Sequence, residues 1–225
     1  MFALVNLPYL YSQRTAMKRI LLLLILLSVA GLCRSQKQTL AQIKASLETA
    51  TNPVAYARDV LKKPYKIDTV IILNSTHFSG IVDSLAYHAK IKKVYGPYEK
   101  KYLVQVLAKL PNTFTRVSQV FIDTSLFTRR IADSLANSIV DRIKTGAASF
   151  EDMAQTYSMG GESVMRGDLG WIARGAIIPE IGKELARRKK GEVFKVWTKA
   201  GVHVIKKASD PKEDTGFALM LRVIM

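Results

Sequence analysis

Two glycine-framed apolar segments constrain the fold of this chain more than any other feature of its sequence. The first is Arg166-Gly167-Asp168-Leu169-Gly170-Trp171, and the second, about thirty residues later, is Gly201-Val202-His203-Val204-Ile205. Between them lie an apolar cluster, residues 177–181, and a charged helix-like run, residues 184–190, which Gly191 closes. Because glycine permits tight turns and close backbone approach, this layout predicts a small binding cup rather than a metal or nucleophile site.

An apolar block near the start of the chain indicates export. Residues 20–32 are almost entirely apolar and follow the basic pair Lys18-Arg19. A positive flank before a short apolar run is typical of a secretory signal. The run has about 13 residues, whereas a membrane-spanning helix needs roughly 20. We therefore expect residues 1–35 to be a leader and signal peptide, with Met17 as the true start and the mature protein in the periplasm or cell envelope.

The only cysteine, Cys33, lies at the end of this leader. A mature chain that starts near Gln36 would have neither a thiol nor a disulfide, so its stability must come from packing. Acylation of Cys33 is a less favoured alternative, because a lipoprotein signal needs a small residue before the cysteine and Leu32 is large.

The chain is strongly basic, with a net charge of +16. Four lysines or arginines and no acids lie within residues 1–35, so residues 36–225 keep a charge of +12. A basic balance favours nucleic acid or an anionic surface as the partner. Export argues against nucleic acid, and the sequence has no nucleic-acid recognition motif. The densest basic run, residues 187–190, fits the end of a helix; contact with an anionic membrane surface is the alternative.

The region 36–112 is predicted to be a small helical or α+β unit. Its apolar spacing predicts a helix over 36–61 that Pro53 interrupts, a strand over 69–73, a helix over 77–89 and two short strands within 94–108, split at Gly96-Pro97. The pair Pro111-Asn112 is predicted to form a turn and to mark a domain boundary.

The region 113–208 is predicted to form a second domain. Residues 114–122 alternate as a strand, with Val117, Gln119 and Phe121 toward one face and Ser118, Val120 and Ile122 toward the other. Helices are expected over 125–145, with an apolar stripe of Ile131, Leu135, Ile139 and Ile143, over 149–157, with Ser149 as the cap, and over 178–190. Strands are expected over 193–197 and 202–206. The tail, residues 209–225, contains a further strand whose partner the sequence leaves open.

Residues 93–100 resemble residues 192–199, at a separation of 99 residues. This spacing suggests a duplicated unit rather than a solenoid, whose period would be about 20 to 50 residues. Our hypothesis is that residues 64–110 preserve part of an ancestral copy of the second domain. It requires the two hairpins to share one geometry.

Residues 114–207 contain six short motifs in the order in which one protein family has them. They are the strand 117–122, the set Gly146, Phe150, Ala154 and Tyr157-Ser158, then Gly167-Asp168-Leu169-Gly170-Trp171, Pro179-Glu180, Gly191-Glu192-Val193, and Gly201-Val202-His203. Together they resemble the parvulin, or rotamase, family of peptidyl-prolyl cis-trans isomerases. The resemblance implies a four-stranded antiparallel sheet wrapped by helices, in an α+β protein, and a cup for a substrate proline.

The resemblance also implies the site residues. His203 and Gln119 stand at the positions of the catalytic pair, and Leu169, Ile177, Ile181 and Thr198 at those that bind substrate. Such a site needs no metal, cofactor or covalent intermediate. The implied partners are unfolded or extended polypeptides that contain X-Pro bonds.

Three departures from the family pattern predict weak catalysis. Gln119 replaces a histidine, Gly160 replaces a cysteine or aspartate, and Ala200 stands where serine is common. Glu162 lies close to Gly160 in sequence, but its register argues against substitution. The expected function is therefore slow isomerisation in aid of folding. The alternatives are a non-catalytic periplasmic chaperone or scaffold, and a basic adaptor for the anionic cell surface.

Overall fold

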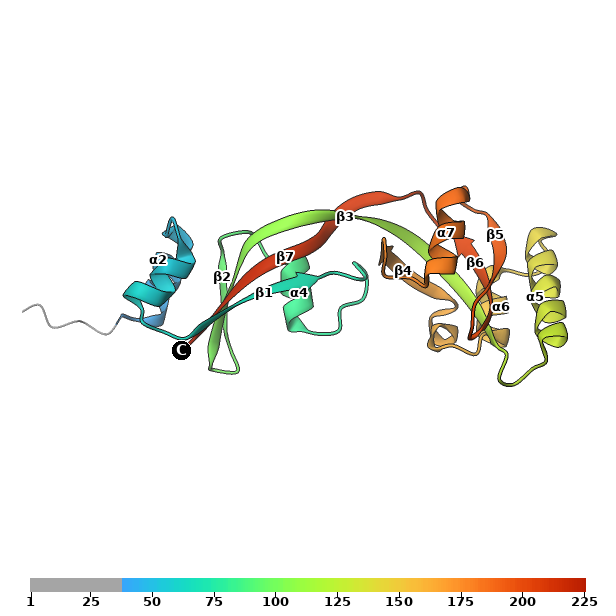
Figure 1. The fold of residues 1–225 in the computed structure, drawn as a ribbon, viewed down its shortest axis with the longest axis horizontal. Coiled ribbons are helices and arrows are strands. Elements are labelled where there is room, and N and C mark those ends of the chain that lie inside the picture. The colour runs from blue at the N-terminus through green and yellow to red at the C-terminus, as the bar shows by residue number, and fades with distance from the viewer. Residues whose placement is uncertain (1–37) are drawn as a thin grey trace, which may run out of the picture. The chain divides into compact units, whose positions relative to one another are not determined.

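The computed structural model describes residues 38–225, which form an α+β protein (Figure 1). The predicted leader, Met17 and Cys33 lie outside the described residues. The chain divides into two compact units, Met1–Ile43 and Lys44–Met225, and the boundary falls within helix α2 (Leu40–Thr49). No helix within residues 38–225 is long and apolar enough to cross a membrane.

The second unit is built on one seven-stranded sheet, and all pairings between its strands are antiparallel. The strands are β1 (Tyr65–Ile71), β2 (Val94–Tyr98), β3 (Tyr102–Asp123), β4 (Asp168–Ala173), β5 (Val193–Trp197), β6 (Gly201–Lys207) and β7 (Lys212–Ile224). Their order is β1-β7-β3-β6-β5, and β2 and β4 also pair with β3. The predicted four-stranded antiparallel sheet is therefore present as β4-β3-β6-β5.

The predicted turn at Pro111-Asn112 is wrong, because β3 runs through both residues as one strand of 22 residues. The register with β7 shifts between Leu110 and Pro111, so the proline sits at an irregularity in the ladder. Proline has no N–H to donate and is tolerated in a strand at such a bulge. Gly216 makes room opposite, since a Cβ there would come within 2.8 Å of the Asn112 nitrogen. The division of the chain near residue 112 stays a hypothesis.

The tail of the chain pairs with the N-terminal part of the sheet. Strand β7 lies between β1 and β3 and runs beside the first half of β3 (Figure 1). The strand expected within residues 217–223 is thus confirmed. Its partners, which sequence alone left open, come from residues more than one hundred positions earlier.

The helices of the first region are shorter than predicted. After α2 come α3 (Pro53–Ala55), the π-helical turn η1 (Tyr56–Val60) and α4 (Ile81–His88). The two strands expected within 94–108 exist, but they separate at residues 99–101 and not at Gly96-Pro97, which lies inside β2.

The duplication hypothesis fails on the geometry of its two hairpins. The β5–β6 pair keeps one register from Val193 to Trp197. The β2–β3 pair shifts register between Tyr95 and Tyr98. The similar sequences therefore adopt different ladders.

Helices α5 (Arg129–Lys144) and α6 (Phe150–Tyr157) pack on one face of β3 and β6. Ser149 caps α6, as predicted, by accepting a hydrogen bond from the Asp152 amide at 3.0 Å. The stripe predicted for α5 is partly wrong: Ala132, Ala136 and Ile139 are buried, whereas Ile131 is 51% exposed. Small alanines face the sheet because they let the helix approach it closely.

Helix α7 (Pro179–Arg187) packs on the opposite face and is held by a buried lysine. The Lys207 Nζ donates to the carbonyl oxygens of Leu185, at 3.1 Å, and Arg188, at 2.7 Å. These are carbonyls at the end of the helix, where no intrahelical donor is available.

We expect Lys207→Met to lower the free energy of unfolding by about 1–3 kcal/mol, because it leaves these carbonyls without a donor in the interior. Urea unfolding measures the change. The matched control is Lys206→Met, which removes a partly exposed ion pair with Glu151 and a cation–π contact with the Phe150 ring and should cost about 1 kcal/mol. Equal losses in both variants would contradict the capping role.

Candidate functional site

The alternation of β3 places the candidate site on the α7 face of the sheet. Val117 packs with α7, whereas Val120 and Ile122 pack with α5 and α6, which confirms the predicted alternation. Phe121 pairs with His203, and Gln119 pairs with Ile205. Gln119 and His203 therefore project from neighbouring strands toward the same face.

Five side chains on this face form one hydrogen-bonded chain. The Thr198 Oγ1 lies 2.9 Å from His203 Nε2, and His203 Nδ1 lies 3.0 Å from Gln119 Oε1. The Gln119 Nε2 donates to Glu162 Oε1 at 3.1 Å, and the Ser158 hydroxyl donates to the same oxygen at 2.6 Å. Ser158 is itself held by the Phe121 amide, which donates to its Oγ at 2.8 Å. The predicted pair, His203 and Gln119, is thus in direct contact.

His203 is deeply enclosed within this chain. His203 is 3% exposed, and its ring stacks on the Phe121 ring with centroids 4.7 Å apart. Burial lowers the pKa of His203, and the nearby Glu162 opposes part of that shift. Both ring nitrogens have partners within the protein, so His203 orients its neighbours and does not itself reach the surface.

This lowered pKa predicts a pH-dependent stability. An unfolded histidine binds a proton near pH 6.5, whereas folded His203 resists protonation, so the unfolded state gains protons first as pH falls. We expect the free energy of unfolding to decline from about pH 6.5 toward pH 5. Urea unfolding at pH 7.5 and pH 5 measures the decline. It should be smaller in His203→Leu; an identical decline in that variant would assign the effect to other groups.

The sequence interpretation of Glu162 is wrong, because the structure brings its carboxylate into the site. The 3-10 turn η2 (Gly161–Met165) carries Glu162, which is 7% exposed. A Cβ added at Gly160 would lie only 2.6 Å from the Glu162 Cδ. The carboxylate thus fills the space above Gly160. One sequence signal pointed to it: Glu162 is the only acid between Tyr157 and Asp168.

The three predicted cup residues meet in one apolar cluster beside this chain. Leu169 and Ile177 are half-buried and pack against a core that contains Ile181 and Val117. Ile181 has no exposed surface, so it supports the cup from beneath and cannot touch a bound ligand in this conformation. The apolar floor is therefore present, with Leu169 and Ile177 as its reachable members.

A cavity of about 260 Å³ continues along the same face. It is lined by Val117, Ile177 and Leu185, together with residues of β3, of the β4–α7 connection and of α7. His203, Gln119 and Thr198 do not line it. Thr198 lines a separate hollow with Trp197 and Glu180. Its hydroxyl therefore contacts His203 and does not line the apolar cavity.

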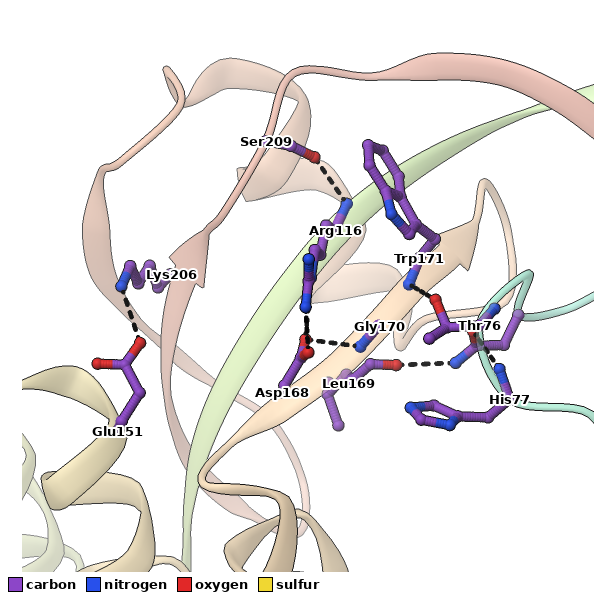
Figure 2. Close-up of polar contacts among 11 residues, drawn as sticks. Thr76, His77, Arg116, Glu151, Asp168, Leu169, Gly170, Trp171, Lys206 and Ser209 are labelled. Carbon is purple, nitrogen blue, oxygen red and sulfur yellow. Dashed lines mark hydrogen bonds and ion pairs between the residues drawn. The ribbon is translucent and has the colours of Figure 1, made fainter.

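Segment 73–77 of the first region covers the free edge of β4 (Figure 2). The Asn74 Nδ2 donates to the Leu169 carbonyl oxygen at 2.8 Å, and the Trp171 amide donates to Thr76 Oγ1 at 3.0 Å. Gly170 permits this contact, because a Cβ there would lie 2.8 Å from the Thr76 Cβ. Sequence reasoning did not find this contact between distant segments.

One ion pair and one hydrogen bond, both made by Asp168, fix the start of β4. Asp168 accepts from Arg116 at 2.6 Å and from the Gly170 amide at 2.9 Å (Figure 2). These bonds hold the pKa of Asp168 below its usual value, although burial opposes them. The cup residue Leu169 thus lies between two anchored neighbours.

We expect Asn74→Ala to loosen this edge locally. The substitution removes the bond to Leu169 and two bonds that its Oδ1 accepts from the Thr76 and His77 amides. Hydrogen exchange of the Trp171 and Ala173 amides should accelerate, because both donate to this segment. The amides of β6 are the internal control and should keep their rates. Unchanged exchange at Trp171 would show that the side chain of Asn74 does not hold the edge.

No group of three or more His, Cys, Asp or Glu side chains within residues 38–225 is arranged to hold a metal ion. The buried polar chain described above instead consists of neutral donors and acceptors and one carboxylate. Its chemistry is that of orientation and hydrogen bonding.

Comparison with known proteins identifies the domain that carries these residues. Residues 102–212 match the family described as a PPIC-type PPIase domain. The chaperone SurA of Cupriavidus metallidurans is 39% identical over 69 residues, which are 30% of this chain and 14% of that protein. The chaperone SurA of Chromobacterium violaceum is 39% identical over 75 residues, 33% of this chain and 17% of that protein.

Among solved structures, PrsA from Bacillus subtilis is 30% identical, with a TM-score of 0.37, over 43% of this chain and 35% of that chain. The matches span less than a fifth of the length of the two SurA proteins. The family match covers β3 to the start of β7, including every member of the hydrogen-bonded chain and the apolar cup. Residues 102–212 therefore belong to the PPIC-type, or parvulin-type, family of peptidyl-prolyl cis-trans isomerase domains.

Proposed function

We propose that this protein is a peptidyl-prolyl cis-trans isomerase that assists the folding of exported proteins. One observation carries the proposal: within a PPIC-type domain, the apolar cluster of Leu169, Ile177 and Ile181 shares one sheet face with the chain from Thr198 to Ser158. An apolar floor suits a prolyl ring, and an ordered polar chain suits the peptide groups that flank it.

To accelerate the reaction, the site needs only to bind the twisted X-Pro bond more tightly than the planar one. Rotation about an X-Pro bond faces a barrier of roughly 20 kcal/mol, which arises from amide resonance. Twisting removes that resonance and reduces the negative charge on the carbonyl oxygen. A site that holds the ring by apolar contact and orders the hydrogen bonds around the twisted bond lowers the barrier. Leu169 and Ile177 would supply the contact, and Gln119 and Ser158 the polar groups within reach.

We propose that the activity is weak compared with that of complete parvulin sites. Gln119 replaces the family histidine, and His203 is enclosed by partners on both ring nitrogens. Gly160 supplies no side chain where the family has a polar one. The rate therefore depends on the Gln119 amide and the Ser158 hydroxyl alone for polar contact with the substrate.

A protease-coupled assay on X-Pro peptides, with an NMR titration of the same peptide, tests the function. We expect slow isomerisation and shifted resonances at Leu169 and Ile177. A rate equal to that of a complete parvulin would refute weak catalysis, and no shift at either residue would refute peptide binding at this cup.

A non-catalytic chaperone is the second candidate, and an exposed apolar surface favours it. Ile71, Phe217 and Leu110 lie in register across β1, β7 and β3. Ile71 is 55% exposed and Leu110 is 63% exposed. Exposed apolar surface of this kind can bind unfolded chains. An isomerase should accelerate proline-limited refolding, whereas a chaperone of this kind should suppress aggregation of proline-free clients equally well.

The proposed location is the periplasm or cell envelope, with polypeptides containing X-Pro as clients. The signal-like residues 20–32 and the likeness to proteins named as chaperones support it. Contact with an anionic membrane surface is a weaker proposal. In the basic run 187–190, Arg188 pairs with Glu184 at 2.9 Å and Arg187 with the same residue at 3.6 Å, which removes part of its free charge.

A further inference from the structure

We propose that Glu162 is a positioning residue of the isomerase site, which fixes the Gln119 amide and, through it, the orientation and tautomer of His203. This inference rests on the proposed function for its catalytic consequence, but its structural part can be tested separately. It gives a role to a residue that the family pattern does not place in the site.

The burial of Glu162 requires an explanation, because a buried acid is costly unless donors satisfy it. Five polar or charged residues are buried within the described part of the chain, and Glu162 is the only acid among them. Its Oε1 accepts from both Ser158 and Gln119. Its main chain is tied as well, since the Gly167 amide donates to the Glu162 carbonyl oxygen at 2.8 Å. Glu162 is thus held in place through both its side chain and its main chain.

The contact with Gln119 determines which way that amide points. A carboxylate only accepts, so the amide must turn its NH₂ group toward Glu162 and its oxygen toward His203. The oxygen then accepts a hydrogen bond from the Nδ1–H of His203, which leaves Nε2 free to accept one from the Thr198 hydroxyl. Without Glu162 the amide can reverse. Its NH₂ group would then face Nδ1, and neutral His203 would favour the Nε2–H tautomer.

The absence of a side chain at Gly160 leaves the space that the Glu162 carboxylate occupies. A side chain at residue 160 would overlap the Glu162 carboxylate, since its Cβ would lie 2.6 Å from both Cδ and Oε1. The two positions therefore compete for one space. An acid can occupy it from residue 160 or from residue 162, but not from both.

A swap of the acid between these positions is the sharpest test. The variants are Glu162→Ala, the double variant Gly160→Asp with Glu162→Ala, and the control Glu151→Ala, which removes a half-exposed surface acid. The readouts are the His203 tautomer, from long-range ¹H–¹⁵N NMR of the imidazole, and kcat and KM on an X-Pro peptide.

We expect wild type and the control to hold His203 as the Nδ1–H tautomer. Glu162→Ala should mix the tautomers and lower kcat by roughly tenfold with little change in KM, since a misplaced group near the reacting bond costs up to about a hundredfold. The double variant should restore the single tautomer and most of the rate.

Two results would overturn the inference. One is an unchanged tautomer in Glu162→Ala, and the other is a folded double variant in which neither the tautomer nor the rate returns. If wild type has no isomerase activity, the proposed function fails, while the tautomer measurement still decides whether Glu162 positions His203.

Discussion

Gly167→Ala should destabilise the protein by about 2–5 kcal/mol, because the added methyl group meets both backbone strain and crowding. Gly167 has a φ of +86°, a left-handed conformation that costs roughly 1–2 kcal/mol for a residue with a Cβ. That Cβ would also lie 2.7 Å from the Ala154 Cβ and 2.8 Å from the Gln119 carbonyl oxygen. Helix α6 or strand β3 would have to move.

The matched control is Gly175→Ala. Gly175 has a φ of +89°, but nothing lies within 4 Å of the position of its Cβ. This variant should lose only about 1–2 kcal/mol of its free energy of unfolding, which is the cost of the left-handed backbone. Urea unfolding of both variants separates backbone strain from crowding. Equal losses would show that the close approach of α6 and β3 at Gly167 contributes nothing.

His203→Leu should lower kcat/KM by up to about a hundredfold, because the loss of this orienting residue misplaces the groups beside the reacting bond. The substitution leaves the Gln119 oxygen and the Thr198 hydroxyl without their shared partner. Because His203 is 3% exposed, the effect should fall on kcat, and peptide binding at Leu169 and Ile177 should persist. Steady-state kinetics with an NMR titration of the same peptide measures both.

The variant His88→Leu is the control for the loss of an imidazole. His88 ends helix α4, and its Nδ1 lies 3.1 Å from the Ser84 carbonyl oxygen, in a hydrogen bond on the protein surface. It should keep the wild-type rate. A His203→Leu enzyme that stays folded and turns over at the wild-type rate would contradict any role for this histidine in catalysis.

Local patterns predicted the parts of the site that depend on local rules. The two-residue period of β3 placed Gln119 with Val117, because successive side chains in a strand alternate between faces. The Ser149 cap was predicted because a hydroxyl before a helix satisfies a free amide. The pairing of Gln119 with His203 came from the family resemblance, and the structure bears out their contact.

Local patterns were wrong where long-range contacts decide. Pro111-Asn112 resembles a turn, yet β7 pairs along both residues and a register shift accommodates the proline. Ile131 fits the helical stripe of α5, yet the sheet contacts Ala132 and Ala136. The register of Glu162 argues against a role in place of residue 160, although a turn brings its carboxylate into the space beside Gly160.

The sequence by itself indicated the family, three of the four strands of the isomerase domain and the glycines that frame its cup; it did not predict β4. These features depend on residue type and on short-range spacing, which are written in the chain. Only the tertiary structure decided which groups meet within the cup and along its edge. Asn74 reaches Leu169 from 95 residues away, and Glu162 reaches Gln119 from 43 residues away. Such contacts form only when the folded sheet brings segments that are distant in sequence together, and short-range sequence patterns do not predict them.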